Sequence, residues 1–447
     1  MKDVNTSIFK AYDIRGVYPQ EIDEDISYRL GRAFVVFLGE DRILVGRDMR
    51  LSSPSLSRAF IEGARDQGAD VVDIGLCSTD MLYFASGDLD LPGVMFTASH
   101  NPKEYNGLKL CRRKAGPISE DTGIAEIRDL VLEGDFPSPS RRGGLEERDM
   151  LERYIDHVLG FIDPAVLRPL KVVADAGNGM AGLVLPALFQ RLPCRLVPHC
   201  FELDGSFPHH QPSPIEPENI ALLQRWVLEA EGDLGMAFDG DADRVFLVDD
   251  KGEPVSGSLT TALVARRILQ EHPGEKIIYN CINSWIVPET IIAYGGIPIR
   301  ERVGHSFIKQ TMAETGAIFA GEHSGHYYFR DNYRADSGLI AALYVLEIVS
   351  REGRPLSEIL KPFKKYYSSG EINSRVEDIP GKLEEIARLH ADAKRIDRLD
   401  GVTVEYDDWW FNVRPSNTEP LLRLNLEAKT RELMEEKRDQ LLALIRS

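Results

Sequence analysis

Residues 42–46 read Arg-Ile-Leu-Val-Gly, a short apolar run that predicts a buried strand. Residues 54–64 then predict a helix with Pro54 in its first turn. Residues 69–75 predict a second strand, and residues 93–97, Gly-Val-Met-Phe-Thr, predict a third. Because short apolar strands alternate with helices, the pattern indicates parallel βαβ units and an α/β fold.

The same alternation starts again further along the chain. A helical stripe over residues 151–159 precedes a predicted strand at residues 170–174, and another round covers residues 277–279 and 317–320. We place domain breaks near residues 147, 253 and 367, where the sequence is polar or contains glycine. These breaks define domains at residues 1–147, 148–253, 254–367 and 368–447.

The last segment has a different pattern. Residues 402–406 and 422–426 alternate polar and apolar side chains with a period of two, and residues 431–445 predict a closing helix. Period-two alternation is typical of strands with one buried face. The segment therefore predicts a small α+β domain with an antiparallel sheet.

Composition narrows the functional class. Of the 447 residues, 43% are hydrophobic and 28% charged, and no run of eighteen apolar residues predicts a membrane span. The first six residues lack the apolar core of a signal peptide, so we expect a cytoplasmic protein. The net charge of −18 argues against a nucleic-acid surface, and five scattered cysteines argue against a disulfide framework or a zinc site.

Residues 239–244, Asp-Gly-Asp-Ala-Asp-Arg, form the sharpest motif, between strands predicted at 234–238 and 245–248. Three carboxylates at alternate positions on a tight loop can converge on one hard cation such as Mg²⁺. A calcium EF-hand loop is disfavoured, because its sixth and twelfth positions hold Arg244 and Asp250 instead of Gly and Glu. A solvated acidic turn is the other alternative. The flanking strands disfavour it, because they place the loop where α/β sites form.

A second motif, residues 97–102, Thr-Ala-Ser-His-Asn-Pro, follows the predicted strand that ends near Phe96. Ser99 would therefore lie just past the carboxyl end of a parallel strand, where α/β proteins bind ligands. A serine is a poor nucleophile unless a base, a metal or a pre-installed phosphate assists it. Taken alone, the motif is more typical of a turn whose side chains satisfy backbone groups.

Three more clusters change this balance. Residues 321–326, Gly-Glu-His-Ser-Gly-His, offer a carboxylate and a hydroxyl for sugar hydroxyls and an imidazole for proton transfer. Residues 414–420, Arg-Pro-Ser-Asn-Thr-Glu-Pro, combine a planar cation with hydroxyl and amide donors, as a phosphate-binding loop does. Residues 10–16, Lys-Ala-Tyr-Asp-Ile-Arg-Gly, would by themselves predict only an edge strand and a turn.

Taken in chain order, 10–16, 97–102, 239–244, 321–326 and 414–420, the five motifs resemble those of the α-D-phosphohexomutases, the family of phosphomannomutase, phosphoglucomutase and phosphoglucosamine mutase. The resemblance covers essentially the whole chain. It implies three mixed α/β domains with parallel-rich sheets plus a C-terminal α+β domain, arranged as four domains around a central active-site cleft. It also implies an intramolecular phosphotransferase that uses Mg²⁺ and a hexose 1,6-bisphosphate intermediate and activator.

The resemblance also implies roles for individual residues. Ser99 is implied to be the serine that carries the phosphoryl group, and its phosphate oxygen is expected to complete a magnesium site. The remaining magnesium ligands are implied to be Asp239, Asp241 and Asp243. The sugar 3- and 4-hydroxyls are implied to bind Glu322 and Ser324. The clamp for the non-transferring phosphate is implied at Arg414, Ser416, Asn417 and Thr418.

Seven other residues match positions that line the family's cleft. We place Arg15, His100, Lys109 and His326 in the catalytic set, and Tyr12, Arg244 and His305 in the substrate-binding set. Around the transferring phosphoryl group the expected cations are Arg244, His100 and Lys109. Lys109 and His326 are the candidates for the general acid and base, and the choice among Lys109, His305 and His326 is left open.

The subfamily can be narrowed from single positions. Phosphoglucosamine mutases usually carry Gln and Gly where this chain has His323 and Asn417, and residues 409–425 look most like bacterial phosphomannomutases. Many mutases that accept both mannose and glucose carry a lysine where residues 280–284, Asn-Cys-Ile-Asn-Ser, offer no cation. The preference between mannose and glucose is therefore left open.

The expected reaction interconverts mannose 6-phosphate and mannose 1-phosphate through a phosphoserine and a hexose 1,6-bisphosphate. The nearest alternative is the same chemistry on glucose phosphates, or on both sugars. A sugar phosphatase and a non-catalytic sugar-phosphate-binding protein are further alternatives, but neither accounts for a serine loop and a phosphate clamp in one chain. The expected partners are hexose phosphates only, with the chain acting as a monomer or a dimer.

Overall fold

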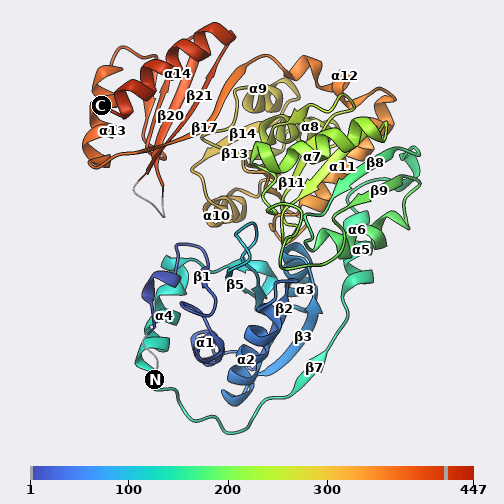
Figure 1. Ribbon diagram of the computed structural model, residues 1–447, viewed down its shortest axis with the longest axis vertical. Helices are drawn as coiled ribbons and strands as arrows, with labels where there is room; N and C mark the ends of the chain where they lie inside the picture. The colour runs from blue at the N-terminus through green and yellow to red at the C-terminus, as the bar shows by residue number, and fades with distance from the viewer. Residues whose placement is uncertain (1–3, 417–420) are drawn as a thin grey trace. The chain divides into compact units, whose positions relative to one another are not determined.

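A computed structural model describes residues 4–416 and 421–447 (Figure 1). The chain divides into two compact units, which we describe separately: residues 1–256 with 324–359, and residues 257–323 with 360–447. Asn417 and Thr418, predicted to bind phosphate, lie outside the described residues. Within the described part of the chain, no helix is both long enough and apolar enough to cross a membrane.

The first unit begins with a seven-stranded sheet of order β1-β5-β4-β2-β3-β7, with β6 paired to β5. β2 runs parallel to β3 and β4, as predicted, whereas β5 runs antiparallel to β1 and β4, so the sheet is mixed. Its strands are β1 (Ile14–Val17), β2 (Arg42–Arg47), β3 (Asp70–Leu76), β4 (Gly93–Phe96), β5 (Tyr105–Arg112), β6 (Gly116–Pro117) and β7 (Leu145–Glu147). Its helices are α1 (Glu24–Leu38), α2 (Ser53–Asp66), α3 (Thr79–Leu89) and α4 (Ile124–Glu133).

The core of this sheet fixes the strand that leads to the serine loop. Phe34 of α1 and Phe60 of α2 pack with tilted rings whose centroids are 5.9 Å apart, and Phe60 meets Phe96 at the end of β4 edge to face at 5.5 Å. All three rings are buried. Because burial of such rings is a main stabilising term, β4 ends at a well-defined place and the serine loop starts from rigid backbone.

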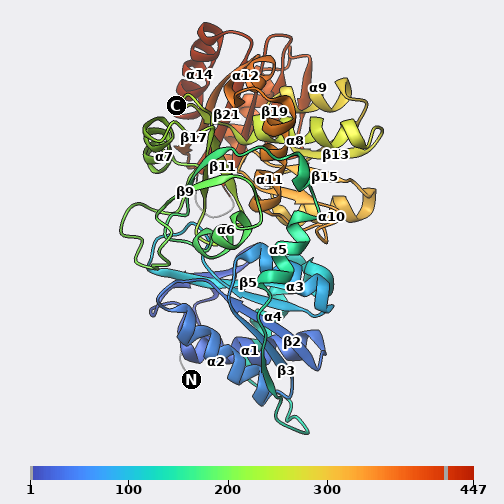
Figure 2. The ribbon, with the colours of Figure 1, turned by 90° about the vertical axis from the view of Figure 1, so that its right-hand side faces the viewer.

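The second sheet of this unit has the order β12-β11-β10-β8-β9. β10 is parallel to β8 and antiparallel to β11, so residues 239–244 form the connection of a hairpin. An extended segment that carries β7 leads from the first sheet to α5 (Figures 1 and 2). The strands are β8 (Lys171–Asp175), β9 (Arg195–His199), β10 (Leu234–Phe238), β11 (Val245–Val248) and β12 (Pro254–Val255). The other elements are α5 (Leu151–Leu159), α6 (Ala181–Phe189), α7 (Pro217–Glu229), β16 (Tyr327–Phe329) and α11 (Gly338–Glu352).

The second unit contains a parallel arrangement in which β13 pairs with β14 on one side and β15 on the other. These strands are β13 (Lys276–Asn280), β14 (Ile297–Glu301) and β15 (Phe319–Gly321). They alternate with α8 (Gly257–Glu271), α9 (Ile286–Ala293) and α10 (His305–Thr315). The chain passes between the units after residues 256, 323 and 359, the last of these within α12 (Leu356–Leu360).

The last sheet is antiparallel, with the order β17-β21-β20-β19-β18, and carries two helices on one face (Figure 1). Phe411 and Leu424 join the core beneath these helices, and the period-two alternation leaves Arg414 and Arg423 on the other face. The strands are β17 (Tyr367–Arg375), β18 (Arg395–Asp397), β19 (Val402–Glu405), β20 (Trp409–Pro415) and β21 (Leu421–Ala428), and the helices are α13 (Ile379–Leu389) and α14 (Arg431–Ile445).

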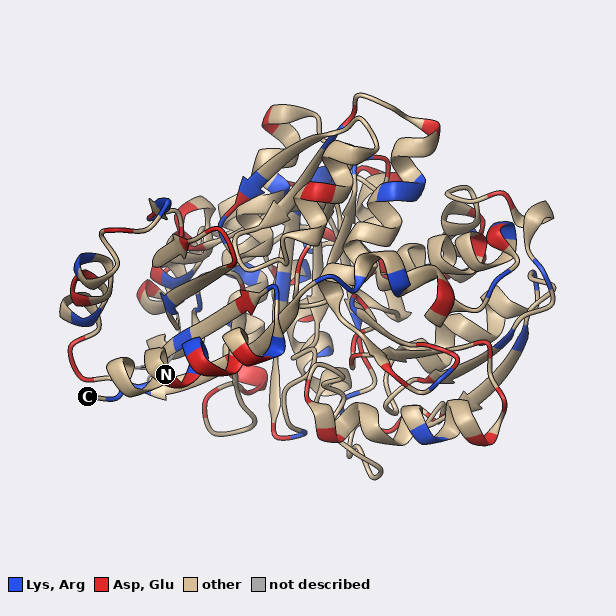
Figure 3. Ribbon diagram, turned by 90° about the horizontal axis from the view of Figure 1, so that it is seen from above, with Lys and Arg blue, Asp and Glu red and all other residues tan. Residues whose placement is uncertain are grey.

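The predicted fold class, three α/β regions and a C-terminal α+β region, is confirmed by these four sheets. The strands predicted at residues 234–238 and 245–248 and the helix predicted at 431–445 have the predicted bounds. Acidic and basic residues are interspersed along most elements (Figure 3). The cations that could bind an anionic substrate must therefore be found residue by residue.

Candidate active site

Ser99 lies in the loop between β4 and β5 with an unusual backbone conformation. Its φ is 50°, in the left-handed region, and its backbone N–H donates to Thr97 Oγ1 at 2.9 Å. The residue is only 4% exposed. A non-glycine residue held in the left-handed region is uncommon and clusters at functional sites, so this loop is held in place by its surroundings.

The serine loop and the aspartate loop are in direct contact. Ser99 Oγ donates to Asp239 Oδ2 at 2.8 Å, and Arg244 Nη2 donates to Ser99 Oγ at 3.2 Å. Gly240 allows this approach, because a Cβ atom there would lie 2.4 Å from the carbonyl oxygen of Ser99. Two motifs separated by 140 residues in sequence therefore share one site.

The three aspartates of the 239–244 loop converge. They are almost completely buried, and each offers a carboxylate oxygen within 4.8 Å of the others. Lys109 Nζ donates to Asp241 Oδ2 at 2.7 Å and to Asp243 Oδ2 at 2.5 Å. Asp241 Oδ1 and Asp243 Oδ1 are buried without a hydrogen-bond partner. An oxygen-only donor set with free buried oxygens fits a hard divalent cation such as Mg²⁺.

The charges of this cluster depend strongly on one another. Burial and the neighbouring carboxylates raise the pKa of Asp239 to about 8, although Arg244 opposes the shift. Burial favours the neutral amine of Lys109, but Asp241 and Asp243 outweigh burial and raise its pKa well above the usual value. Lys109 is therefore a cation here, which favours a charge-neutralising role over the general-base role that the sequence left open.

His100 is next to the serine but is not the cation expected from sequence. Its Nδ1 accepts a hydrogen bond from Arg244 Nη2 and lies 3.3 Å from Ser99 Oγ. Burial, together with the positive charges of Arg244 and Arg15, lowers the pKa of His100 well below its usual value. His100 is therefore a neutral acceptor that orients Arg244, and the positive charge beside Ser99 comes from Arg244 itself.

Thr79 is a member of this site that sequence reasoning missed. Its hydroxyl donates to Asp241 Oδ2 at 2.5 Å, and its backbone N–H donates to the carbonyl oxygen of Asp241 at 3.0 Å. Thr79 is the first residue of α3, directly after the N-cap Ser78. The Ser-Thr-Asp run at residues 78–80 is typical of a helix start, and nothing in it connects Thr79 with residues 239–244.

Ser324 and His326 reach the same cluster from the segment before β16. Ser324 Oγ and His326 Nδ1 are 3.1 Å apart. His326 Nε2 lies 3.9 Å from Asp243 Oδ1 and 3.9 Å from Asp336 Oδ2. An imidazole beside the aspartate loop is suitably placed for proton transfer.

Arg15 approaches the serine loop from β1. Its Nη1 donates to Asn101 Oδ1 at 2.5 Å, and its guanidinium pairs with Asp13. Tyr12 lies in the bend that precedes β1. The structure therefore places the predicted 10–16 motif next to the predicted 97–102 motif.

The predicted sugar-binding residues are divided between the two units. Glu322 follows β15 in the second unit and is 2% exposed, and its Oε2 accepts a hydrogen bond from Asn280 Nδ2 at 3.3 Å. His305 begins α10 in the same unit, whereas Ser324 belongs to the first unit. Asn280 belongs to the segment in which the sequence offers no cation, so an amide orients Glu322 there.

The predicted phosphate-binding arginine has a second arginine as its neighbour. Arg414 and Arg423 are cross-strand partners on β20 and β21, and both donate to the carboxylate of Glu371, at 2.7 and 2.9 Å. Arg423 Nη2 also donates to Ser416 Oγ at 3.3 Å. We call Arg414 and Arg423 the arginine pair. Burial opposes the charge of Glu371, but the arginine pair outweighs it and lowers the pKa of this carboxyl.

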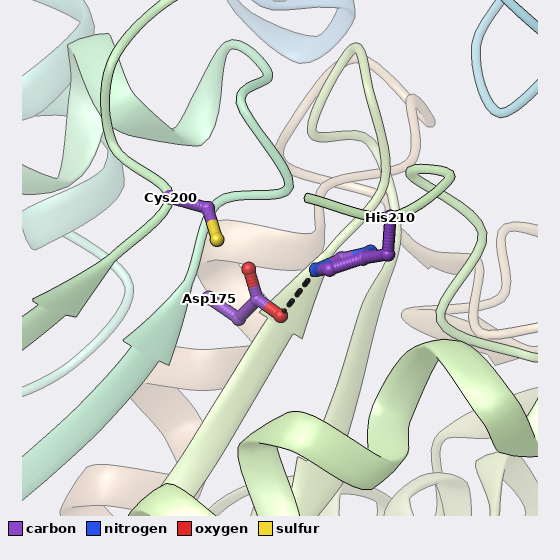
Figure 4. A group of neighbouring side chains, drawn as sticks. All are labelled: Asp175, Cys200 and His210. Carbon is purple, nitrogen blue, oxygen red and sulfur yellow. Dashed lines mark hydrogen bonds and ion pairs between the residues drawn. The ribbon is translucent and has the colours of Figure 1, made fainter. Parts of the chain in front are cut away.

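A third cluster of potential ligands lies at the end of β8, where Asp175, Cys200 and His210 point toward one another (Figure 4). His210 Nδ1 donates to the carbonyl oxygen of Gln211 at 2.8 Å, and Nε2 donates to Asp175 Oδ2 at 2.9 Å. Burial lowers the pKa of His210, but hydrogen bonds to Asp175 and Cys200 outweigh it and raise the pKa to about 10. His210 and Asp175 thus form an imidazolium–carboxylate pair in which each charge has its partner. This pair ties the 205–212 loop to β8.

Four family models match consecutive parts of the chain. They are the phosphoglucomutase/phosphomannomutase α/β/α domain I at residues 6–138, domain II at 152–252, domain III at 256–366 and the C-terminal domain at 371–444. Together they cover the serine loop, the aspartate loop, the 321–326 loop and the arginine pair.

Individual relatives match over almost the full length. A phosphomannomutase of Escherichia coli is 42% identical over 98% of this chain and 99% of its own, and one of Salmonella montevideo is 41% identical over 99% and 100%. A crystal structure of a phosphoglucomutase/phosphomannomutase family protein from Burkholderia thailandensis superposes with a TM-score of 0.91 at 35% identity, covering 99% of this chain and 97% of its own. With four matched domains and relatives of this similarity, the chain belongs to the phosphoglucomutase/phosphomannomutase family and is a phosphohexomutase.

Proposed function

We propose that this enzyme interconverts mannose 6-phosphate and mannose 1-phosphate, with Ser99 as the residue that gives and takes the phosphoryl group. The contact of Ser99 Oγ with Asp239 at 2.8 Å carries this proposal, because it puts the only predicted nucleophile against the only predicted hard-cation loop. The choice of mannose is supported by full-length relatives that are named phosphomannomutases. Glucose phosphates are the second candidate, supported by the name of the Burkholderia family protein.

The first half-reaction transfers the phosphoryl group from phosphorylated Ser99 to the substrate. The bond between Ser99 Oγ and phosphorus breaks, a bond between the sugar 1-oxygen and phosphorus forms, the 1-hydroxyl proton leaves to a base, and Ser99 Oγ takes up a proton to become a hydroxyl. Phosphoryl transfer has a loose transition state, so positioning and charge stabilisation supply most of the catalysis. Arg244, which donates to Ser99 Oγ, is placed to stabilise the departing serine oxygen.

The second half-reaction reverses the roles of the two ends of the sugar. The hexose 1,6-bisphosphate turns over, its 6-phosphoryl group returns to Ser99, and hexose 1-phosphate leaves. We assign proton transfer to His326, because Lys109 is held as a cation between two carboxylates and His326 Nε2 lies 3.9 Å from Asp243. Free hexose 1,6-bisphosphate would restore the phosphoserine whenever it is lost.

Magnesium is the metal we propose for the aspartate loop, with Asp239, Asp241 and Asp243 as its protein ligands. When bound, Mg²⁺ supplies positive charge that neutralises the phosphoserine and favours departure of the serine oxygen. Lys109 and Arg244 add to that positive charge from the protein side. Thr79 keeps Asp241 in place through two hydrogen bonds.

The arginine pair is the proposed site for the phosphate that does not react. Two guanidinium groups on neighbouring strands, with the Ser416 hydroxyl beside one of them, provide the planar donors that bind phosphate oxygens. Glu371 holds both side chains in one orientation before substrate binds. Glu322, held by Asn280, is the proposed partner of the sugar hydroxyls, together with Ser324.

The serine assignment is tested with Ser99→Ala. We expect mutase turnover to fall by at least ~10⁴-fold, as when a nucleophile is removed from an enzyme that acts through a covalent intermediate. Labelling with ³²P-hexose 1,6-bisphosphate should phosphorylate the wild-type protein and leave the variant unlabelled. The exposed Ser138 provides the control, because Ser138→Ala should keep both activity and labelling. Turnover near the wild-type rate in Ser99→Ala would remove Ser99 from the reaction.

The sugar assignment is tested by comparing mannose 1-phosphate and glucose 1-phosphate in the same assay. We expect the higher kcat/KM with mannose 1-phosphate. A higher value with glucose 1-phosphate would replace the mannose assignment and leave the chemistry unchanged. Release of inorganic phosphate without isomerisation would instead indicate a phosphatase.

A further inference from the structure

Arg50 is a completely buried arginine next to the serine loop that no motif had marked. It follows β2, between Asp48 and the start of α2, and its side chain has no exposed surface. A buried guanidinium is costly unless its donors are satisfied. The partners of Arg50 therefore show what its burial achieves.

Four of those partners are backbone carbonyl oxygens of one short segment. Arg50 Nη2 donates to the carbonyl oxygens of Ser99 at 2.8 Å and Asn101 at 2.7 Å. Its Nη1 donates to those of Pro102 at 2.8 Å and Tyr105 at 3.0 Å. One side chain thus holds the loop from the reacting serine to the first residue of β5. We call these four contacts the carbonyl clamp.

The guanidinium is itself held from its other sides. Asp48, which is also fully buried, lies 3.3 Å from Arg50 Nε and accepts hydrogen bonds from the Arg50 backbone N–H at 2.9 Å and from Ser53 Oγ at 2.6 Å. The ring of Phe207 lies under the guanidinium, with the Arg50 Cζ 5.1 Å from its centroid. Gly205 packs on the backbone, since a Cβ atom there would be 2.6 Å from Arg50 Cα. Arg50 therefore has little freedom to follow a moving loop.

We propose that Arg50 is the positioning residue that fixes Ser99 for phosphoryl transfer, a proposal that rests on the function proposed for Ser99. The carbonyl oxygen of Ser99 is held between Arg50 Nη2 and Gly240, while the side chain of the same residue meets Asp239 and Arg244. With its carbonyl fixed and its φ at 50°, the clamp sets the direction of the Ser99 Cα–Cβ bond, and the contacts with Asp239 and Arg244 then fix Oγ about that bond. A lysine has three donors on one point and cannot reach four carbonyls, so arginine is required here.

The test compares Arg50→Lys and Arg50→Met with the wild-type enzyme, with rates given per folded protein. We expect kcat to fall by about 10–100-fold in Arg50→Lys and further in Arg50→Met, because displacements of about 1 Å in an active site have effects of this size. KM should stay within about 2-fold, because the side-chain hydrogen bonds of Arg50 within the described ranges 4–416 and 421–447 go to the serine loop and not to a proposed substrate-binding residue. Arg29→Lys is the control, a buried arginine of α1 that pairs with Asp25, and should change neither parameter by more than about 2-fold.

A second readout does not depend on catalysis. Amide hydrogen exchange of the peptide covering residues 97–107 should accelerate in Arg50→Lys, with exchange in α1 unchanged. If Arg50→Met does not fold, Asp48→Asn replaces it, because it loosens Arg50 without removing it, and kcat should fall by about 3–10-fold. The positioning role of Arg50 would be overturned if Arg50→Lys changed neither kcat nor the exchange rate. It would also be overturned if the variant changed KM alone. A wild-type enzyme without mutase turnover would instead overturn the proposed function and leave the exchange result standing.

Discussion

The serine–aspartate region, formed by the loops at residues 97–102 and 239–244, and the arginine pair have opposite balances of acidic and basic groups. In the first, three aspartates face two cations, Lys109 and Arg244, and all but Lys109 are almost completely buried. In the second, two arginines share one carboxylate, Glu371, which is partly exposed. Carboxyl groups in excess suit a cation, whereas guanidinium groups in excess suit an anion. We therefore propose that a protein with a net charge of −18 binds phosphate by gathering two arginines around a single acid.

The two regions also differ in how tightly their parts are fixed. Ser99 is held at its backbone by Arg50 and at its hydroxyl by Asp239 and Arg244, and Asp241 is held by Thr79. The arginine pair lies on two neighbouring strands, and both of its guanidinium groups donate to Glu371, the carboxylate that we propose substrate phosphate replaces. We therefore expect damage to the first region to lower kcat and damage to the second to raise KM.

After replacement of Ser99 itself, the largest effect should come from the aspartate loop. We expect Asp241→Asn to lower kcat by at least ~10³-fold, because loss of a metal-binding carboxylate removes several kcal/mol of charge stabilisation. KM should change by less than ~3-fold, because the substitution leaves the arginine pair, the proposed phosphate site, unchanged. Chelation of metal in the wild-type enzyme should have a similar effect, reversed by added Mg²⁺.

Asp249→Asn provides the matched control for that experiment. Asp249 is a buried aspartate of the same hairpin, but its Oδ1 accepts from the backbone of Lys251 and Glu253 at the far end of β11. Its replacement should lower thermal stability and leave kcat per folded protein nearly unchanged. If a chelator left the turnover rate of the wild-type enzyme unchanged, the metal assignment would be contradicted.

A smaller effect of the opposite kinetic type is expected in the arginine pair. Arg414→Lys keeps the charge but loses the planar pair of donors, and we expect KM to rise by about 10–100-fold with kcat changed much less. Arg423→Lys should raise KM by about 3–10-fold, since it removes one of two guanidinium groups. Steady-state kinetics on hexose phosphates measures both.

Arg438, a half-buried residue of α14 that pairs with Asp439, serves as the control position for these lysine substitutions. Arg438→Lys should leave both constants unchanged. If Arg414→Lys lowered kcat and left KM unchanged, the prediction that the first region governs kcat and the second governs KM would be wrong.

What the sequence could predict follows from how local each signal is. The strands around residues 239–244 were predicted with their observed bounds, because an apolar run of five residues between turn residues has few alternative structures. The aspartate loop and Ser99 were identified because their residue types and spacing carry chemistry in one short segment. Both were also supported by the family resemblance, so the prediction did not rest on pattern alone.

The residues that sequence missed act through contacts between distant segments. Arg50 and Thr79 hold atoms 49 and 162 residues away, and their own surroundings in sequence look like an ordinary turn and an ordinary helix start. Arg423 was hidden in a strand whose alternation explained it as a surface residue. His100 was expected to be charged, and its environment, which only the fold provides, makes it neutral.

The smallest effect on activity is expected at His210, whose charge pair with Asp175 belongs neither to the serine–aspartate region nor to the arginine pair. Its pKa is raised from 6.5 to about 10 by the pair with Asp175, so the folded state binds the proton more tightly than the unfolded state. The stabilisation is therefore complete below about pH 6.5 and is lost as the pH rises toward 10. We expect His210→Gln to lower the thermal unfolding midpoint most near pH 6, by a few degrees, and hardly at all at pH 10, with kcat within about 2-fold at pH 7. The exposed His272, replaced by Gln, should show no such pH dependence. If the difference in thermal unfolding midpoint between wild type and His210→Gln grew with pH, His210 would be neutral in the folded protein. A large loss of kcat would make this cluster part of the catalytic machinery rather than a link between the 205–212 loop and β8.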